Sequence, residues 1–402
     1  MIKFLVIAQD LRVSGTSEGI VSRSFLSKLR MTYPNALIDV VYLKSHPNED
    51  QLHLLPVDSI KAHILNLKYP FFIKLINRLY WRIFHVSLAA KHITNVYRSY
   101  IAKIDHQKYD HIFIRSAGVA HETILAVKDL PILKRAIVNF HDPYPVFWYV
   151  GSQSKLTNLE MFKMKEMMCV VSQAKTCMSS ANTLSNDMEF LYGTRKKFYT
   201  LPHQYSDTVF DLSDIGSVLQ KNKKITISYH GAIQFGRNID ILLDAYQELI
   251  DENRSYKENT EFVLRLRGKH NKRLTQKYVQ SENIFVLDTL NFSNSAYEQI
   301  HVADINIIIE NGPLYCNILV GKAPFLASFG KPIFSISPKR SELREIINDE
   351  QYIADCDNKE EIKQKLENLI INRLNSDEPV SPFGDYFSDE NFIKNLNTIL
   401  SD

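Results

Sequence analysis

Cysteine is scarce in this 402-residue sequence, which contains only Cys169, Cys177, Cys316 and Cys356. None of the four belongs to a Cys-x-x-Cys pair or to a Cys/His spacing typical of metal ligands. We therefore expect no metal site. We also expect the four thiols to be reduced and buried in a cytoplasmic protein.

Long hydrophobic runs are missing as well. No window approaches the roughly 18 uninterrupted apolar residues of a membrane-spanning helix. The apolar run at residues 3–8 is too short for a signal peptide, has the wrong flanks, and is typical of a buried parallel strand. These absences predict a cytoplasmic protein, either free or lying on the inner face of the cell membrane without crossing it.

A strong excess of one charge is absent, since the formal net charge is only +3. The basic residues accompany no groove-reading motif, so nucleic acid is not expected as a partner. Hydrophobic residues make up 45% of the chain and charged residues 23%, as in an ordinary soluble globular protein. The length predicts two or three domains.

Acidic residues are missing from one long segment. Between residues 59 and 104 there are eight Lys or Arg residues and no Asp or Glu. On a helix, Lys74, Arg78 and Arg82 fall on one side. The other side is apolar and contains Phe72, Leu75, Ile76, Leu79 and Ile83. This pattern suits a helix lying in an anionic membrane surface, although a helix that buries its apolar side in the core would show the same stripe.

The G-x-G-x-x-G fingerprint is absent, so a dinucleotide is not indicated. The first apolar run leads instead into residues 14–19, which place Gly15 and Gly19 ahead of a helical pattern. A tight turn accounts for Gly15 as well as a bound ligand does.

What the sequence does contain is a regular alternation of strand-length apolar runs and helical periods. In the first half the runs are 3–8, 37–43, 111–114, 136–140 and 176–180. In the second half they are 225–229, 262–266, 284–287, 304–309 and 332–336. This alternation predicts an α/β protein of two doubly wound Rossmann-like domains that face a cleft.

The domain limits are expected where the alternation lapses. Polar and charged residues at 207–224 mark a boundary, and a segment rich in Pro, Asp and Ser at 376–386 precedes a last helix. We therefore expect domains at 1–205 and 206–385. The remaining helix, 386–402, is expected to pack back on the first domain.

A polar loop follows the strand expected at 136–140. It begins with His141, Asp142 and Pro143, at the edge of a parallel sheet where ligand sites form. His141 is a candidate for orienting or deprotonating a hydroxyl group near neutral pH. A structural pairing of His141 with Asp142 is the alternative.

The second half carries signals of an anion site. The strand at 225–229 leads through Gly231 to Arg237 and Asn238 before a helix, so backbone N–H groups there would face an anion. Lys322 precedes a further short helix. Basic side chains in such loops stabilise negative charge on a leaving phosphate, which predicts an enzyme that handles a phosphorylated donor. Surface charges with no such role are the alternative for Arg237 and Lys322.

In their order and spacing these segments resemble a GT-B glycosyltransferase, nearest to glycosyltransferase family 4, over essentially the whole chain. The resemblance is carried by residues 14–19, His141, residues 201–203, Gly231, Arg237, Asn238, Arg267, Glu310, Lys322, the Gly-Lys-Pro turn at 330–332, and Glu342.

The resemblance implies that a sugar is transferred, with retention, from a nucleotide-diphosphate sugar to a glycan or lipid-linked acceptor in surface-polysaccharide biosynthesis. It implies no metal and no other cofactor. The residues implied are His141 and Glu310 as catalytic groups, Gly231, Arg237, Asn238, Arg267, Lys322 and Glu342 for the donor, and Gly15, Gly19 and Asp142 on the acceptor side.

Two departures from the family pattern keep alternatives open. Glu310 can supply the first acid of the usual E-x7-E, but Ile318 stands at the second position, and Ala232 replaces an Arg that often follows the first glycine. A degenerate member acting as a binding or scaffolding subunit of a glycan assembly complex would fit these losses. A nucleotide-sugar epimerase of the same architecture would need two carboxylates in its cleft, and the sequence shows no convincing pair.

Overall fold

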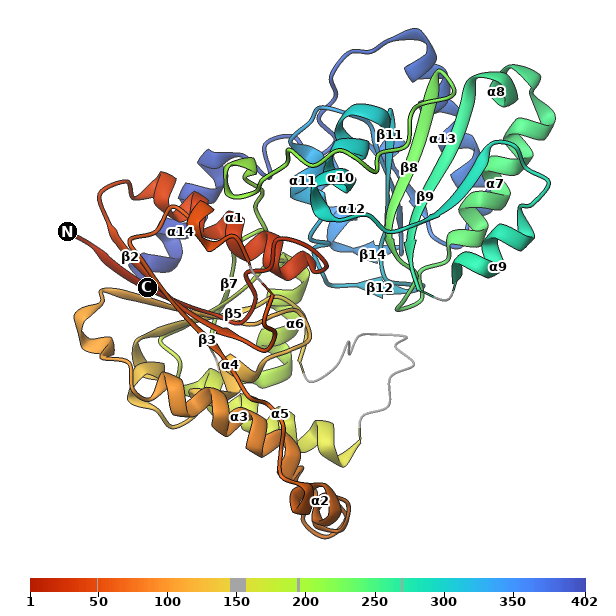
Figure 1. Ribbon diagram of the computed structural model, residues 1–402. Helices are drawn as coiled ribbons and strands as arrows, with labels where there is room; N and C mark the ends of the chain where they lie inside the picture. Colours follow the sequence, from red (N-terminus) through yellow and green to blue (C-terminus); the bar gives the residue numbers. More distant parts are fainter. Residues whose placement is uncertain (49, 145–156, 194–195, 269) are drawn as a thin grey trace. The chain divides into compact units, whose positions relative to one another are not determined.

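The computed structural model describes residues 1–48, 50–144, 157–193, 196–268 and 270–402. The chain forms two compact units. Unit 1 comprises Met1–Val209 together with Asp389–Asp402, and unit 2 comprises Phe210–Ser388. Each unit contains its own parallel sheet flanked by helices (Figure 1). The fold class predicted from the alternation, two doubly wound Rossmann-like domains, is confirmed.

Unit 1 is built on a seven-stranded parallel sheet in the order β3-β2-β1-β4-β5-β6-β7. The strands are β1 Lys3–Ala8, β2 Leu37–Lys44, β3 Ser59–Ile64, β4 His111–Arg115, β5 Ala136–Phe140, β6 Thr176–Ser179 and β7 Phe198–Thr200. The order reverses at β1, which pairs with both β2 and β4. The carboxyl ends of strands beside such a reversal are where open parallel sheets bind ligands.

The helices of unit 1 connect and cover these strands. They are α1 Ser17–Thr32, α2 Phe71–Phe84, α3 Leu88–Ile101, α4 Glu122–Ala126, α5 Asn158–Gln173, α6 Asn182–Tyr192 and α14 Asp389–Ser401, with 3-10 turns at Leu52–Leu54, His106–Lys108, Pro131–Arg135 and Asp207–Val209. α1 buries Val21, Phe25 and Leu29, the residues whose spacing indicated this helix.

The C-terminal helix α14 belongs to unit 1. Phe392 places its ring 6.4 Å from that of Phe25, and Asp389 forms a 2.5 Å ion pair with Lys28. The apolar face of α14 is therefore buried against α1.

Unit 2 contains a six-stranded parallel sheet in the order β10-β9-β8-β11-β13-β15, and a separate pair of β12 with β14. The strands are β8 Ile225–Ala232, β9 Thr260–Arg267, β10 Ile284–Asp288, β11 Ile305–Ile309, β12 Tyr315–Cys316, β13 Ile333–Ser337, β14 Arg340–Ser341 and β15 Ile353–Asp355. β8 pairs with both β9 and β11, so the order reverses there.

The helices of unit 2 follow the same alternation. They are α7 Ile239–Glu252, α8 Arg254–Asn259, α9 His270–Lys277, α10 Phe292–Tyr297, α11 Ala323–Ala327, α12 Glu342–Ile346 and α13 Lys359–Asn375, with a π-helical turn at Glu298–Val302 and a 3-10 turn at Glu350–Tyr352. Ile225 to Tyr229 is wholly buried, as a central parallel strand requires.

Three expectations need correction. β8 does not end at Tyr229 but runs on to Ala232. Cys169 is partly exposed, whereas the other three cysteines are buried. The strands β3, β7 and β15 were missed because they are short or lie at an edge of a sheet, so their apolar runs are weak.

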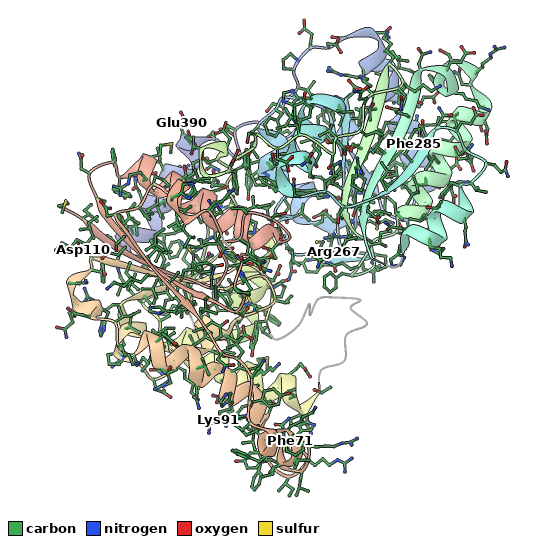
Figure 2. The ribbon with its side chains drawn as sticks, viewed as in Figure 1. Phe71, Lys91, Asp110, Arg267, Phe285 and Glu390 are labelled. Carbon is green, nitrogen blue, oxygen red and sulfur yellow. The ribbon has the colours of Figure 1, made fainter. Side chains whose placement is uncertain are left out.

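The most exposed helix of unit 1 is α2. None of its 14 residues is buried, so the interpretation of its apolar stripe as core is wrong. Figure 2 labels Phe71, the first residue of α2. Within the described ranges, no helix is both long and apolar enough to cross a membrane.

Candidate functional site

Two basic side chains of unit 2 meet at the carboxyl end of β8. The Nζ atom of Lys322 donates a hydrogen bond to the carbonyl oxygen of His230 and lies 4.6 Å from the centre of the Tyr229 ring. Arg237 donates from Nη1 to the carbonyl oxygen of Ala232 at 3.2 Å and from Nε to Oδ1 of Asn311 at 3.1 Å. The structure thus brings together two of the predicted donor-site residues that lie far apart in the sequence.

Neither cation is neutralised locally. In the described part of the chain, no carboxylate forms an ion pair with Lys322 or Arg237. Burial, reinforced by the nearby Arg237 charge, lowers the pKa of Lys322 to about 7. Both groups therefore gain electrostatic stabilisation when an anion arrives.

The lack of a side chain at Gly231 leaves room for the Lys322 ammonium at the carboxyl end of β8. A Cβ atom at Gly231 would lie 3.2 Å from Nζ of Lys322 and 3.0 Å from the hydroxyl of Tyr229. A side chain at residue 231 would therefore press on the ammonium, and glycine leaves it room.

The expected strand–glycine–helix anion nest is not formed at Gly231. β8 continues to Ala232, and α7 begins only at Ile239. Asn238 caps that helix, because its Oδ1 accepts a hydrogen bond from the N–H of Asp240 at 3.2 Å. The positive charge of this corner comes from the two side chains rather than from a helix beginning at Gly231.

Arg267 ends β9 and is exposed, and Gly268 follows with φ +110°. Figure 2 labels Arg267. Its predicted donor role stays a prediction.

Two acids of unit 2 are deeply buried. Glu310 follows β11 and is 1% exposed, and Glu342 begins α12. Burial raises the pKa of Glu310 to about 7, Glu342 adds to the rise, and Ser337 and Ser341 oppose it. Glu342 accepts a hydrogen bond from the hydroxyl of Tyr386 at 3.2 Å. Glu310 thus keeps a carboxyl group that can be neutral near pH 7, next to Asn311, the partner of Arg237.

His141 of unit 1 lies directly after β5 and is held on several sides. Its N–H donates to Oγ of Ser116 at 3.0 Å, and its carbonyl oxygen accepts from Oγ of Ser180 at 3.3 Å. Its Nε2 lies 3.0 Å from Nη2 of Arg115. Arg115 is therefore a charged neighbour of the imidazole, which neither the catalytic interpretation nor the alternative pairing with Asp142 had included.

Nε2 of His141 has two neighbours that make opposite demands on it. Nη2 of Arg115, at 3.0 Å, can only donate, whereas Oδ1 of Asn139, at 3.1 Å, can only accept. Nδ1 has no hydrogen-bond partner among the described residues. Burial, with the Arg115 charge, holds the pKa of His141 well below its usual range. The ring therefore stays neutral near pH 7 and is poorly suited to accepting a proton.

The glycine loop of unit 1 is shaped by close approach. Gly15 has φ +85° and is exposed, and Oγ1 of Thr16 caps α1 by accepting from the N–H of Gly19 at 3.3 Å. A Cβ atom at Gly19 would collide with the backbone of Arg12. The two glycines therefore have structural reasons of their own.

Asp142 has an acidic neighbour that the sequence did not reveal. A Cβ atom on Gly118 would lie 2.5 Å from Oε1 of Glu18 and 3.0 Å from Oδ2 of Asp142. Two carboxylates thus converge on one point, and burial raises the pKa of Glu18. This is a carboxylate pair of the kind that the sequence alone had not shown.

Arg115 is the main residue that sequence reasoning missed, and His203 had been noted only as part of the segment 201–203. Arg115 was visible as a basic residue that ends an apolar run at 111–114, and His203 follows β7. The rings of His203 and His141 lie 5.3 Å apart, edge to face. Residues 145–156, which follow the His141 loop, lie outside the described residues.

One group of potential metal ligands is present within the described ranges. Single ligand atoms of Asp355, Cys356 and Asp357 lie within 4.8 Å of one another. Burial raises the pKa of the Cys356 thiol to about 11, so it stays protonated and is a poor ligand.

Comparison with known proteins is informative at the level of structure only. No protein-family model matches the sequence. No curated protein matches it either.

Several solved structures align with the whole chain. HepE of Anabaena, in complex with UDP and glucose, aligns with a TM-score of 0.60 and 10% identity over 100% of both chains. Sucrose-phosphate synthase of Thermosynechococcus elongatus gives 0.60 and 10% over 100% of this chain and 95% of its own. UDP-GlcNAc 2-epimerase of Neisseria meningitidis, bound to UDP-GlcNAc, gives 0.58 and 14% over 99% and 100%. The chain therefore shares the fold of these GT-B-type proteins, with two parallel-sheet Rossmann-like units.

Proposed function

We propose that this protein is a cytoplasmic glycosyltransferase that acts in surface-polysaccharide biosynthesis. It transfers a sugar, with retention, from a nucleotide-diphosphate sugar to a glycan or lipid-linked acceptor, without a metal or other cofactor. The observation that carries the proposal is the convergence of Arg237 and Lys322, both without a carboxylate partner in the described chain, at the end of β8. Solved structures of the same fold that hold UDP with glucose, or UDP-GlcNAc, support it.

The chemistry follows from the charges. When the bond from the anomeric carbon to the diphosphate breaks, negative charge grows on the leaving phosphate oxygen. Preplaced cations in a dry corner stabilise that charge more strongly than water does. Lys322 and Arg237 supply such cations at the carboxyl end of β8.

Two buried groups, one in each unit, have complementary roles in this proposal. Glu310, with a pKa raised to about 7, offers a carboxyl group to the hydroxyls of the donor sugar. In unit 1, neutral His141 forms a hydrogen bond with a sugar hydroxyl through Nδ1, which has no partner among the described residues. It does not act as a general base, because burial and the Arg115 charge hold its pKa well below the usual range.

The first experiment is thermal stabilisation of the full chain by UDP, GDP, ADP, CMP and TDP without metal. We expect one diphosphate to raise the melting temperature of the wild type and to have little effect on the double variant Arg237→Met/Lys322→Met. Lys339→Met is the matched control. Lys339 is an exposed lysine of the same unit that, unlike Lys322, lies near a carboxylate, with its Nζ 3.8 Å from Oδ2 of Asp355. No stabilisation by any nucleotide would overturn the donor site and favour the scaffolding subunit.

A nucleotide-sugar epimerase is the second candidate, and the pair formed by Glu18 and Asp142 favours it. Two carboxylates facing one point could remove a proton and return it on the other side of the substrate. The two candidates differ without acceptor. An epimerase converts the donor into its epimer, whereas a transferase only hydrolyses it slowly, and proton NMR of the sugar distinguishes the two products.

We also propose that α2 lies in an anionic membrane surface while the enzyme works on a lipid-linked acceptor. Seven large apolar side chains of this helix are 48–72% exposed: Phe71, Phe72, Leu75, Ile76, Leu79, Ile83 and Phe84. Such a concentration of exposed apolar residues on one helix marks an interaction surface.

The charges around the apolar face of α2 indicate which kind of partner covers it. Lys74, Arg78 and Arg82 are exposed on α2 beside the apolar face, and no acid lies between residues 59 and 104. Anionic headgroups attract each such cation, and the apolar face enters the acyl boundary. A protein partner would need an acidic rim around an apolar groove. Sedimentation with anionic vesicles distinguishes a membrane surface from such a protein partner.

A further inference from the structure

Arg115 of unit 1 is a buried cation for which the described residues supply no counter-ion. It is the last residue of β4 and is 4% exposed. Its guanidinium carbon lies 4.2 Å from the centre of the Phe25 ring, and Nη2 donates to Nε2 of His141. In the described part of the chain no carboxylate forms an ion pair with Arg115, and its Nε has no hydrogen-bond partner.

A buried unpaired charge is costly, since desolvation of a cation is repaid only by an anion or by several good acceptors. Burial alone lowers the pKa of Arg115 to about 9, and no acid nearby opposes this. The guanidinium remains charged at neutral pH. An anion that entered beside it would remove the cost.

A cavity lies directly beside Arg115. Asn139, His203 and Gln204 form its polar wall with Arg115, and Phe25 and Met178 are among its apolar residues. Its volume of about 10 Å³ corresponds to roughly one water-sized group. Burial lowers the pKa of His203 to about 3, so Arg115 is the charged member of the cavity wall at neutral pH.

The position of the cavity relates it to the reaction. Arg115 ends β4, and His141 follows the adjacent strand β5. These are neighbouring carboxyl ends in the sheet of unit 1, the unit expected to hold the acceptor.

We propose that the Arg115 cavity binds one anionic oxygen of the acceptor, so that the acceptor carries a phosphate or carboxylate group. The identity of the occupant as an acceptor rests on the proposed function. The binding of an oxyanion by Arg115 does not. A phosphate and a carboxylate share the required chemistry, a charged oxygen that accepts hydrogen bonds from a guanidinium.

The test measures the melting temperature of the full chain, wild type and Arg115→Met, at constant chloride. The additions are inorganic phosphate and two matched pairs, glucose 6-phosphate with glucose and glucuronate with glucose. We expect Arg115→Met without ligand to melt higher than the wild type, because an uncompensated charge is gone. We expect inorganic phosphate and at least one charged sugar to stabilise the wild type, and Arg115→Met to need at least tenfold more of either.

Arg135→Met is the matched control in the same unit. The guanidinium of Arg135 donates to the carbonyl oxygens of His106 and Tyr109 at 3.1 and 2.7 Å and lies outside the cavity. This variant should melt lower than the wild type and keep the full response to phosphate.

Opposite results would overturn the proposal. A lower melting temperature for Arg115→Met with an unchanged phosphate response would make Arg115 a structural residue. Stabilisation of the wild type by chloride alone, lost in Arg115→Met, would mean that an inorganic ion fills the cavity. Should Arg115→Met not fold, Arg115→Lys replaces it: phosphate binding weakened by the change supports the proposal, and unchanged binding overturns it. The nucleotide panel is a separate readout, so a response to phosphate without a response to nucleotides rejects the donor site and keeps the oxyanion site.

Discussion

The ammonium of Lys322 lies 4.6 Å from the centre of the Tyr229 ring, and the two residues are 93 positions apart in the sequence. The ring face attracts the cation but does not neutralise it, and the hydrogen bond to the carbonyl of His230 fixes its direction. The side-chain nitrogen of Lys322 is thereby held next to Gly231, where a Cβ atom would lie 3.2 Å from it. This arrangement has measurable consequences.

Replacing Lys322 or Arg237 by Met should weaken binding of the nucleotide diphosphate. Charge-assisted hydrogen bonds contribute about 1.5–3 kcal/mol each, which corresponds to roughly a 10- to 150-fold loss. Isothermal titration with the diphosphate found in the thermal panel measures it. Lys339→Met should bind as the wild type does, and an unchanged affinity of the two site variants would remove them from the donor site.

Diphosphate binding should take up a proton just above neutral pH. The pKa of Lys322 in the unliganded protein is lowered to about 7, and a bound diphosphate raises it. The protonated form binds better, so affinity falls as pH rises from about 7 towards 9. Titration in buffers of different ionisation enthalpy reports the proton. The uptake should disappear in Lys322→Met, and equal uptake in both proteins would contradict the assignment.

Glu310→Gln should stabilise the protein at high pH but not at low pH. The pKa of Glu310 is raised by burial to about 7, so the folded chain binds more protons than the unfolded chain between about pH 4.5 and 7. Stability contributed by this group is present below pH 4.5 and is lost as pH rises to 7. The loss is on the order of 3 kcal/mol. Melting curves of both proteins at pH 4.5 and 8 check it, and a constant difference would refute it.

His141→Ala should lower turnover and leave diphosphate affinity nearly unchanged, because His141 belongs to unit 1 and the cations to unit 2. The pKa of His141 is held far below neutrality. The rate should therefore show no His141 titration between pH 6 and 8. His141→Gln, which keeps an N–H donor, should recover part of the activity. A normal rate for His141→Ala would leave the residue with a structural role only.

Reversing the charge of Lys74, Arg78 and Arg82 to Glu should release the protein from anionic vesicles, since each cation near the surface contributes about 1 kcal/mol. Sedimentation with vesicles of phosphatidylglycerol and phosphatidylcholine measures the bound fraction. The matched control reverses Lys103, Lys108 and Lys134, which are exposed elsewhere in unit 1. The wild type and both triple variants should have the same melting temperature, because the substituted side chains are exposed and α2 buries no residue. Equal binding of both triple variants would reject the membrane surface.

Much of the fold was predictable because a buried parallel strand has a signature that needs no partner to be seen. The runs at 3–8 and 136–140 became β1 and β5 with the expected limits. β3 was not predicted because it is an edge strand in a basic segment and buries few apolar side chains. β7 was not predicted because it has only three residues. The expected end of a strand at Tyr229 was wrong because the hydrogen-bond ladder to β9 continues through Ala232.

The sequence by itself determined the class of fold and the residue types at the ends of its strands, because strand and helix periodicities are local properties of the chain. Only the tertiary structure decided which of those residues meet. β4 and β5 lie side by side, and that adjacency made Arg115 a partner of His141, which the sequence had not indicated. Tertiary packing also left α2 uncovered. An amphipathic stripe is the same in the core and at a surface, and only the elements packed around it determine whether it is buried.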